Sequence, residues 1–281
     1  MPLLRPAGAR VRRLSLHPLR DLPLPDLQLP GRHSLPEVRG GSRSPAQAGV
    51  KRRLVLFDID GTLLLSDGAG RRAIVAAVRA HVPDPDAIRR IRFDGKTDPQ
   101  IVAEMLAAAG DPAPEEPSRV AEVLEAYVAH LESDLAVNGH RSRLMPGIPA
   151  LLDALESEPA VLLGLLTGNV VRGAHLKLRA AGLDPARFVV GAFGSDHARR
   201  GELPPIAARR AAPHFGRVPH GADVVIIGDT PADVQCAESV AARTVAVATG
   251  GFTAEQLAAT GADHVFADFA DLERAREAIL S

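Results

Sequence analysis

The stretch Leu54-Val-Leu-Phe-Asp-Ile-Asp-Gly-Thr-Leu63 joins an apolar run to two acids that are two residues apart. An apolar, β-branched run of this length predicts a buried β-strand. Carboxylates at the end of a buried strand need a cation beside them, and their oxygens suit Mg²⁺. The first acid, Asp58, could also act as a nucleophile while the second, Asp60, handles protons. The alternative is a strand that simply ends in an Asp-Gly turn.

The rest of the chain alternates apolar runs with helical patterns. With the first run at 53–57, the expected strands are 161–166, 187–192, 223–228, 243–248 and 263–266. The expected helices are 148–157, 170–181, 204–212, 232–242, 253–260 and 270–279. This alternation predicts an α/β fold, a Rossmann-like parallel sheet covered on both faces. Ligands of such sheets bind beyond the carboxyl ends of the strands. The polar residues at those ends are Asp58, Thr167, Asp196 and Asp229.

Residues 68–143 interrupt the alternation and hold no convincing strand. Asp98 and Pro99 predict the N-cap and the first position of a helix that ends near Gly110. Ser118 predicts the cap of a second helix, which carries an apolar stripe. We therefore expect a helical domain inserted between the first and second strands of the sheet.

The domain organisation follows from these boundaries. Residues 51–67 and 144–281 are expected to form the sheet core, with 68–143 as the insert. Residues 1–50 hold 8 of the 23 prolines and show no sustained periodicity, because prolines break helices and strands. We expect this segment to be a disordered extension.

The composition argues against several classes of function. The 281 residues carry a net charge of −1, with no Trp and one Tyr, which argues against a nucleic-acid-binding surface. The chain has no run of about 18 apolar residues, so no transmembrane helix is expected. The single cysteine, Cys236, cannot form an internal disulfide and fits a reducing compartment such as the cytoplasm. We expect it to be a packing residue.

The pattern Asp-x-Asp-Gly-Thr-Leu resembles motif I of the haloacid-dehalogenase-like (HAD) hydrolase superfamily. Three later segments are similar to its motifs II, III and IV in order, at 165–169, 196–205 and 226–233. The resemblance covers residues 51–281 and implies a Mg²⁺-dependent phosphatase whose insert is a C1-type helical cap. The tail patterns at 247–253 and 261–266 look most like the phosphoglycolate-phosphatase-like branch.

The resemblance assigns roles to residues of the motifs. Asp58 is the expected nucleophile, which forms an aspartyl-phosphate, and Asp60 is the expected general acid/base. Members that resemble true dehalogenases lack the second acid, so Asp60 indicates phosphoryl transfer rather than carbon–halogen cleavage. The expected phosphate-binding residues are Gly61, Thr62, Gly168, Asn169 and the catalytic Thr167. The expected Mg²⁺ ligands are Asp58, Asp60 through its carbonyl, Asp229 and Asp233. Asp233 could instead orient the site, or be only a first-turn acid favoured by the helix dipole.

Motif III departs from the family pattern, which supplies a lysine that is often followed by proline. Aligning the helix start at Pro205 with that of the family places Arg200 at the lysine position. Three alternatives remain open from the sequence: the neighbouring Arg199, a solvated basic loop, and Lys177 on the preceding helix.

Lys96 lies in residues 93–98, a Gly-hinged polar turn that opens onto a helix of the insert. A helix start favours anions, so we expect Lys96 to face the active site and contact substrate; a solvated turn is the alternative.

The expected function is hydrolysis of a small phosphorylated metabolite by a monomer or homodimer. The rivals are a sugar phosphomutase or other phosphotransferase, and a binding module of the same fold without catalysis.

Overall fold

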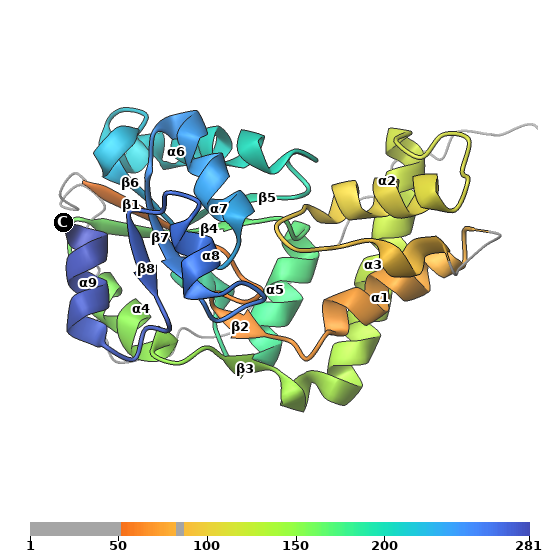
Figure 1. Ribbon diagram of the computed structural model, residues 1–281, viewed down its shortest axis with the longest axis horizontal. Helices are drawn as coiled ribbons and strands as arrows, with labels where there is room; N and C mark the ends of the chain where they lie inside the picture. Colours follow the sequence, from red (N-terminus) through yellow and green to blue (C-terminus); the bar gives the residue numbers. More distant parts are fainter. Residues whose placement is uncertain (1–51, 83–86) are drawn as a thin grey trace, which may run out of the picture. The chain divides into compact units, whose positions relative to one another are not determined.

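A six-stranded parallel sheet forms the centre of the fold and confirms the predicted α/β class (Figure 1). The structure, a computed structural model, describes residues 52–82 and 87–281, so the extension predicted over 1–50 lies outside the described residues. The strand order is β5-β4-β1-β6-β7-β8. The strands are β1 Arg53–Phe57, β4 Val161–Thr167, β5 Val190–Phe193, β6 Val224–Gly228, β7 Arg243–Val247 and β8 His264–Phe266.

Helices cover both faces of the sheet, as the buried strand pattern predicts. Val55 and Phe57 of β1 belong to one apolar cluster, and Leu54 and Leu56 belong to another. The first cluster includes side chains of α4 (Ile148–Glu156), α5 (Val171–Ala180) and α9 (Leu272–Leu280). The second includes α6 (Leu203–Phe215), α7 (Pro231–Cys236) and the buried Cys236, in agreement with its expected packing role. The short α8, Ala254–Ala258, packs against β7 and β8.

The register brings the ends of three strands to one edge of the sheet. Phe57 pairs with Leu165 of β4 and with Ile227 of β6. The backbone N–H of Asp58 then donates to the carbonyl of Ile227 at 2.9 Å. Full burial of the apolar side chains of β1, each worth about 1.5–3 kcal/mol, holds Asp58 at that edge.

Two predicted boundaries are wrong for local reasons. The strand expected at 187–192 begins only at Val190, because Pro185–Arg187 form a 3₁₀ turn that the Asp184 side chain caps. The helix expected at 232–242 is α7, which begins at Pro231, ends at Cys236 and continues as a 3₁₀ turn, Ala237–Val240. Ala241, with a φ of 51°, ends that turn.

The insert is helical, as predicted, and contains three α-helices among its described residues. They are α1 Ala69–Arg79, α2 Asp98–Ala108 and α3 Pro117–Asn138, and α1 was not predicted individually. These helices share their own apolar cluster, in which Ile74, Met105 and Tyr127 are fully or almost fully buried. Val170, next to the motif II loop, joins the same cluster and so connects the insert to the sheet.

Both predicted helix caps in the insert are wrong by one or two positions. Thr97 is the N-cap of α2, and its hydroxyl accepts a hydrogen bond from the N–H of Gln100 at 3.3 Å. Asp98 is already helical there, which leaves its carboxylate available for other contacts. α3 begins at Pro117, so its N-cap is Glu116 rather than Ser118; proline favours the first helical position.

A two-stranded antiparallel ribbon stands where the insert leaves and rejoins the sheet layer. Leu64–Leu65 (β2) pairs with Arg143–Leu144 (β3), and two residues are too few to show a strand period.

All described residues fall in one compact unit, and the division into core and cap stays a prediction. Within residues 52–82 and 87–281, no helix has the length and apolar character needed to cross a membrane.

Candidate active site

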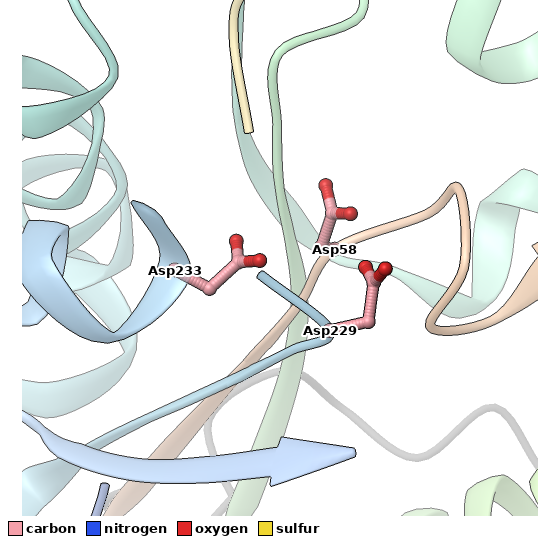
Figure 2. A group of neighbouring side chains, drawn as sticks. All are labelled: Asp58, Asp229 and Asp233. Carbon is pink, nitrogen blue, oxygen red and sulfur yellow. The ribbon is translucent and has the colours of Figure 1, made fainter. Parts of the chain in front are cut away.

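Three buried carboxylates meet at the carboxyl ends of β1 and β6. Asp58 follows β1, Asp229 follows β6 and Asp233 lies in the first turn of α7. One oxygen of each lies within 4.8 Å of the others, and Figure 2 shows the three side chains gathered together. Three anions this close repel one another unless cations are present. Carboxylate oxygens are the donors that Mg²⁺ prefers, so the cluster fits a divalent cation.

Arg200 supplies positive charge to this cluster. It lies in the 3₁₀ turn Arg200–Glu202 just before α6, and it is buried. Its Nη2 donates to Oδ1 of Asp58 at 3.0 Å and also to Asp233. By contrast, the side chain of Arg199 is 78% exposed and pairs with Glu202. The geometry therefore favours Arg200 over Arg199 as the motif III cation, while its catalytic role stays a prediction.

Burial changes the proton affinity of the cluster. Desolvation raises the pKa of Asp58 to about 7, with neighbouring carboxylates adding to the rise and Arg200 opposing it. Desolvation also raises the pKa of Asp229 well above its usual value. A carboxylate must be ionised to attack phosphorus. A second cation, in addition to Arg200, would therefore favour the ionised form of these carboxylates.

Asp233 and Asp229 differ in how their oxygens are used. Oδ1 of Asp233 accepts from Arg200, and its Oδ2 accepts from the N–H of Thr230 at 3.0 Å and from its hydroxyl at 2.7 Å. In Asp229, Oδ1 accepts from the hydroxyl of Thr62 at 3.2 Å. Both oxygens of Asp233 are therefore engaged within the chain. Asp58 and Asp229 are the more open pair for a metal ion, and Asp233 holds Arg200 in place.

Two glycines pack directly on the Asp229 carboxylate. Gly61 has a φ of 86°, and a Cβ there would lie 2.3 Å from Oδ2 of Asp229. A Cβ on Gly250 would lie 1.7 Å from the same oxygen. Only glycine leaves room for the carboxylate at either position. Gly61 was predicted as a site residue, whereas Gly250 lies in the loop after β7 and belongs to none of the four motifs.

The motif II residues form a tight loop at the end of β4. The hydroxyl of Thr167 accepts from Nδ2 of Asn169 at 2.8 Å and from its backbone N–H at 3.3 Å. The carbonyl of Gly168 accepts from the N–H of Asp98 at 2.7 Å. A Cβ on Gly168 would lie 2.1 Å from the carbonyl oxygen of Lys96, so this loop lies directly against the first turn of α2.

Asp60 belongs to a second charged cluster, which sequence reasoning missed. Its Oδ2 accepts from Nζ of Lys177 at 2.6 Å and from Nδ2 of Asn169 at 2.8 Å. Asp98 and Tyr127 lie beside this pair and interact with each other. Lys177 had been considered only as a substitute for Arg200. One signal was available: Lys177 shares the buried stripe of α5 with Ala174 and Leu178, where a lysine needs a buried anion.

These groups line one cavity of about 260 Å³. Its walls include Asp58, Asp60, Thr167, Gly168, Asn169, Lys177, Arg200 and Asp229, with Arg71, Lys96, Asp98 and Tyr127 from the insert. A Cβ on Gly95 would lie 2.5 Å from Cβ of Ala232, so the turn of the insert also lies against the motif IV helix. The structure thus brings most of the predicted site residues and the insert around one small space, while Gly61, Thr62 and Asp233 do not line it.

Asp196, the polar residue expected after the third strand of the chain, does not join this cavity. Its carboxylate accepts from both Nη atoms of Arg210 at 2.6 and 2.7 Å and from the N–H of Phe193 at 2.9 Å. These bonds stabilise the turn after β5. Asp196 is therefore a structural residue in this arrangement, and Arg200 is the residue of that segment that reaches the carboxylate cluster.

Lys96 lines the cavity, and its ammonium pairs with Glu104 of α2. Lys96→Ala is expected to raise KM about 5- to 30-fold with little change in kcat, because one charged contact is worth roughly 1–2 kcal/mol. Glu104→Gln is the control and should have a much smaller effect. Steady-state kinetics on each accepted substrate provides the measurement. Unchanged kcat/KM for every substrate would show that this loop does not contact substrate.

A family model for haloacid dehalogenase-like hydrolases matches residues 55–238, a range that includes all four motif segments. The chain belongs to this family. A phosphoglycolate phosphatase of Rhodospirillum rubrum is 30% identical to this HAD hydrolase over 230 residues, or 78% of this chain and 89% of that protein. The predicted enzyme class, a HAD-type phosphatase, is confirmed at that level.

Solved structures confirm the fold of this HAD hydrolase. CbbY of Rhodobacter sphaeroides, in complex with phosphate, has a TM-score of 0.61 at 24% identity, covering 78% of this chain and 96% of that one. A hydrolase from Pseudomonas syringae has a TM-score of 0.59 at 23% identity, covering 82% and 99%. At these identities the likeness supports the fold and leaves the substrate open.

Proposed function

We propose that this HAD phosphatase hydrolyses phosphomonoesters of a small metabolite in a Mg²⁺-dependent reaction that passes through an aspartyl-phosphate on Asp58. One observation carries the proposal. Asp58 is bonded to Arg200 and lies within 4.8 Å of two further carboxylates, at the end of a buried strand that faces a cavity. A carboxylate, a cation and a metal-type donor set are the groups that phosphoryl transfer to a nucleophile requires.

The proposed reaction has two steps, in which Asp58, Asp60 and Arg200 have different roles. In the first, an oxygen of Asp58 attacks phosphorus, and the bond from phosphorus to the alcohol oxygen breaks as Asp60 donates a proton to it. In the second, Asp60 accepts a proton from water, whose oxygen attacks phosphorus and releases Asp58. Arg200 opposes the negative charge that gathers at Asp58 in both steps.

The donor set fits Mg²⁺, with Asp58 and Asp229 as the carboxylates that would hold it. When bound, the ion would offset repulsion between Asp58 and the phosphate and orient the phosphoryl group. Gly61 and Gly250 leave the Asp229 carboxylate room beside Asp58, and Thr62 fixes its orientation. Asp60 would contribute only its backbone carbonyl, since its carboxylate is held by Lys177.

The small cavity supports a small substrate. Its volume of about 260 Å³ and the cationic Lys96 and Arg71 in its wall suit a compact, anionic phosphate ester. The Rhodospirillum relative is a phosphoglycolate phosphatase, which makes phosphoglycolate the first compound to test on this chain. As part of the same proposal we place the enzyme in the cytoplasm, because its single cysteine is buried and cannot pair within the chain. The expected monomer or homodimer stays a prediction.

A substrate screen tests the proposal. Purified enzyme would be assayed with p-nitrophenyl phosphate, phosphoglycolate and a panel of sugar phosphates, each with Mg²⁺ and with EDTA. Mg²⁺-dependent release of phosphate is the expected result. Isomerisation of a bisphosphosugar without net phosphate release would indicate a phosphomutase. Absence of turnover on the whole panel, with Mg²⁺ bound, would instead support a binding module.

Mg²⁺ is expected to stabilise the fold more strongly at high pH. The raised pKa of Asp58 means that the folded metal-free chain binds more protons than the unfolded chain between about pH 4 and 7. Stability of the metal-free form should therefore fall as pH rises through this window. Mg²⁺ competes with that proton, so its stabilisation should be about 2 kcal/mol larger at pH 8 than at pH 5.5.

Thermal melting with saturating Mg²⁺ or EDTA at both pH values measures this difference. On the order of 2–4 °C per kcal/mol is expected for a chain of this size. Asp58→Asn is the control, since it cannot take up this proton and should lose the part of the pH dependence that comes from Asp58, while Asp229 keeps its own. A Mg²⁺ effect of equal size at pH 5.5 and 8 would contradict the assignment of Asp58 to the metal site.

A further inference from the structure

Lys177 stands at the centre of the second charged cluster, apart from the residues that bind Asp58. It projects from α5, is only 4% exposed, and its Nζ lies 2.6 Å from Oδ2 of Asp60 and 2.6 Å from Oδ1 of Asn169. Two cations of the site thus pair with different acids, Arg200 with Asp58 and Lys177 with Asp60. This division gives the proposed nucleophile and the proposed acid/base separate partners.

The contacts fix one oxygen of Asp60 and leave the other available. Oδ2 accepts from both Lys177 and Asn169, and these two side chains are also bonded to each other. A carboxylate held in this way cannot rotate freely about its Cβ–Cγ bond. Among the described residues, no side chain or backbone N–H donates to Oδ1, and Asp60 lines the cavity. Oδ1 is therefore the oxygen left to exchange a proton with substrate.

Residues of the insert lie around Lys177. Asp98, at the start of α2, and Asp60 both favour its charged form and raise the pKa of Lys177 against the effect of burial. Tyr127 of α3 contacts the same region and interacts with Asp98. Gly70 of α1 has ordinary helical geometry, yet a Cβ there would lie 2.9 Å from Nζ of Lys177. The three α-helices described in the insert thus each place a residue near the ammonium group.

We propose that Lys177 is a positioning residue, which holds Asp60 so that Oδ1 donates its proton to the leaving oxygen of the substrate. This inference rests on the proposed function. As the bond between phosphorus and the leaving oxygen breaks and the bond to Asp58 forms, the proton moves from Oδ1 to the leaving oxygen. Asp60 then becomes a carboxylate, and Lys177 and Asn169 already donate to its Oδ2.

The consequence is a dependence on the leaving group. p-Nitrophenolate leaves without a proton, whereas an alkoxide such as that of benzyl phosphate needs one. Lys177→Met keeps much of the side-chain volume and removes the ammonium. It is expected to lower kcat/KM for benzyl phosphate about 10²-fold, the size of a typical acid–base contribution, and that for p-nitrophenyl phosphate less than about fivefold. These two esters are similar in size, so binding differences are small.

Gly70→Ala tests the same idea without removing a charge. The added methyl must displace the ammonium by a few tenths of an ångström. It should therefore lower kcat/KM for benzyl phosphate about 3- to 10-fold more than kcat/KM for p-nitrophenyl phosphate. Gly139→Ala is the matched control, because its Cβ would make ordinary contacts at 3.6 Å with Ala180. It should leave both substrates unaffected. Melting temperatures of all variants identify any loss of folding.

The outcomes separate this inference from the proposed function. Equal losses on both esters in a folded Lys177→Met or Gly70→Ala variant would show a structural role and overturn the inference, as would no loss at all. If Lys177→Met fails to fold, the Gly70→Ala result decides. Failure of the proposed function would appear in the wild-type enzyme and in Asp58→Asn, whichever way the leaving-group comparison falls.

Discussion

Asp58→Asn is expected to lower kcat by at least about 10³-fold on every substrate while the chain keeps its fold. The amide has nearly the shape of the carboxylate but is a far weaker nucleophile toward phosphorus. The substitution also removes a buried group whose pKa is raised to about 7, so it should not destabilise the metal-free protein at neutral pH. Rapid-mixing and steady-state kinetics, together with melting curves, provide the measurement.

Asp58→Glu is the informative companion to this variant. It keeps the negative charge and the ability to bind Mg²⁺, but it moves the attacking oxygen by about one bond length. Misplacement of about 1 Å can lower a rate on the order of 10²-fold. Strong loss in both variants is expected for a nucleophile. High activity of Asp58→Glu would reduce Asp58 to a metal ligand, and near-wild-type activity of a folded Asp58→Asn would remove the mechanism altogether.

Arg200→Ala is expected to have the second largest effect, about 2–4 kcal/mol on kcat/KM, by analogy with loss of one preorganised donor. The guanidinium contacts two buried carboxylates, Asp58 and Asp233, which would be left without their partner. Breaking a buried pair in this way also costs about 3–5 kcal/mol of stability, so activity must be compared below the melting transition.

Two substitutions control the arginine result. Arg200→Lys should recover part of the activity, because lysine is the usual residue of the family at this motif and a single nitrogen of Arg200, Nη2, makes both carboxylate contacts. Arg199→Ala should have little effect, since its side chain is 78% exposed and pairs only across one turn with Glu202. If Arg199 were essential and Arg200 dispensable, the alignment of this loop with the motif III lysine of the family would be wrong by one residue.

The sequence was sufficient to predict the sheet and the meeting of the motif I and motif IV acids at its edge. The acids of motifs I and IV are close in sequence to buried apolar strands, and parallel strands end at a common edge, so their meeting follows from the pattern. Arg200 was harder to place, because Arg199 has the same chemistry and only the fold shows which one is buried. The 3₁₀ turn that directs Arg200 inward has no clear sequence signature.

The second cluster could not be predicted in the same way. Lys177 and Asp60 are 117 residues apart in the chain, and Asp98 and Tyr127 come from the insert. Their meeting depends on how the insert packs on the sheet, which no local pattern encodes. Asp98 was expected to be a helix cap, and the one-residue shift to Thr97 is what directs its carboxylate to the N–H of Val170.

The stereochemical course at phosphorus tests the central claim most directly. A phosphorothioate ester made chiral at phosphorus with two oxygen isotopes would be hydrolysed in water carrying the third isotope, and the configuration of the thiophosphate product would be determined. Transfer to Asp58 followed by transfer to water requires two inversions, so the account predicts overall retention of configuration. A single inversion would mean that water attacks the substrate directly, and it would contradict an aspartyl-phosphate intermediate on Asp58.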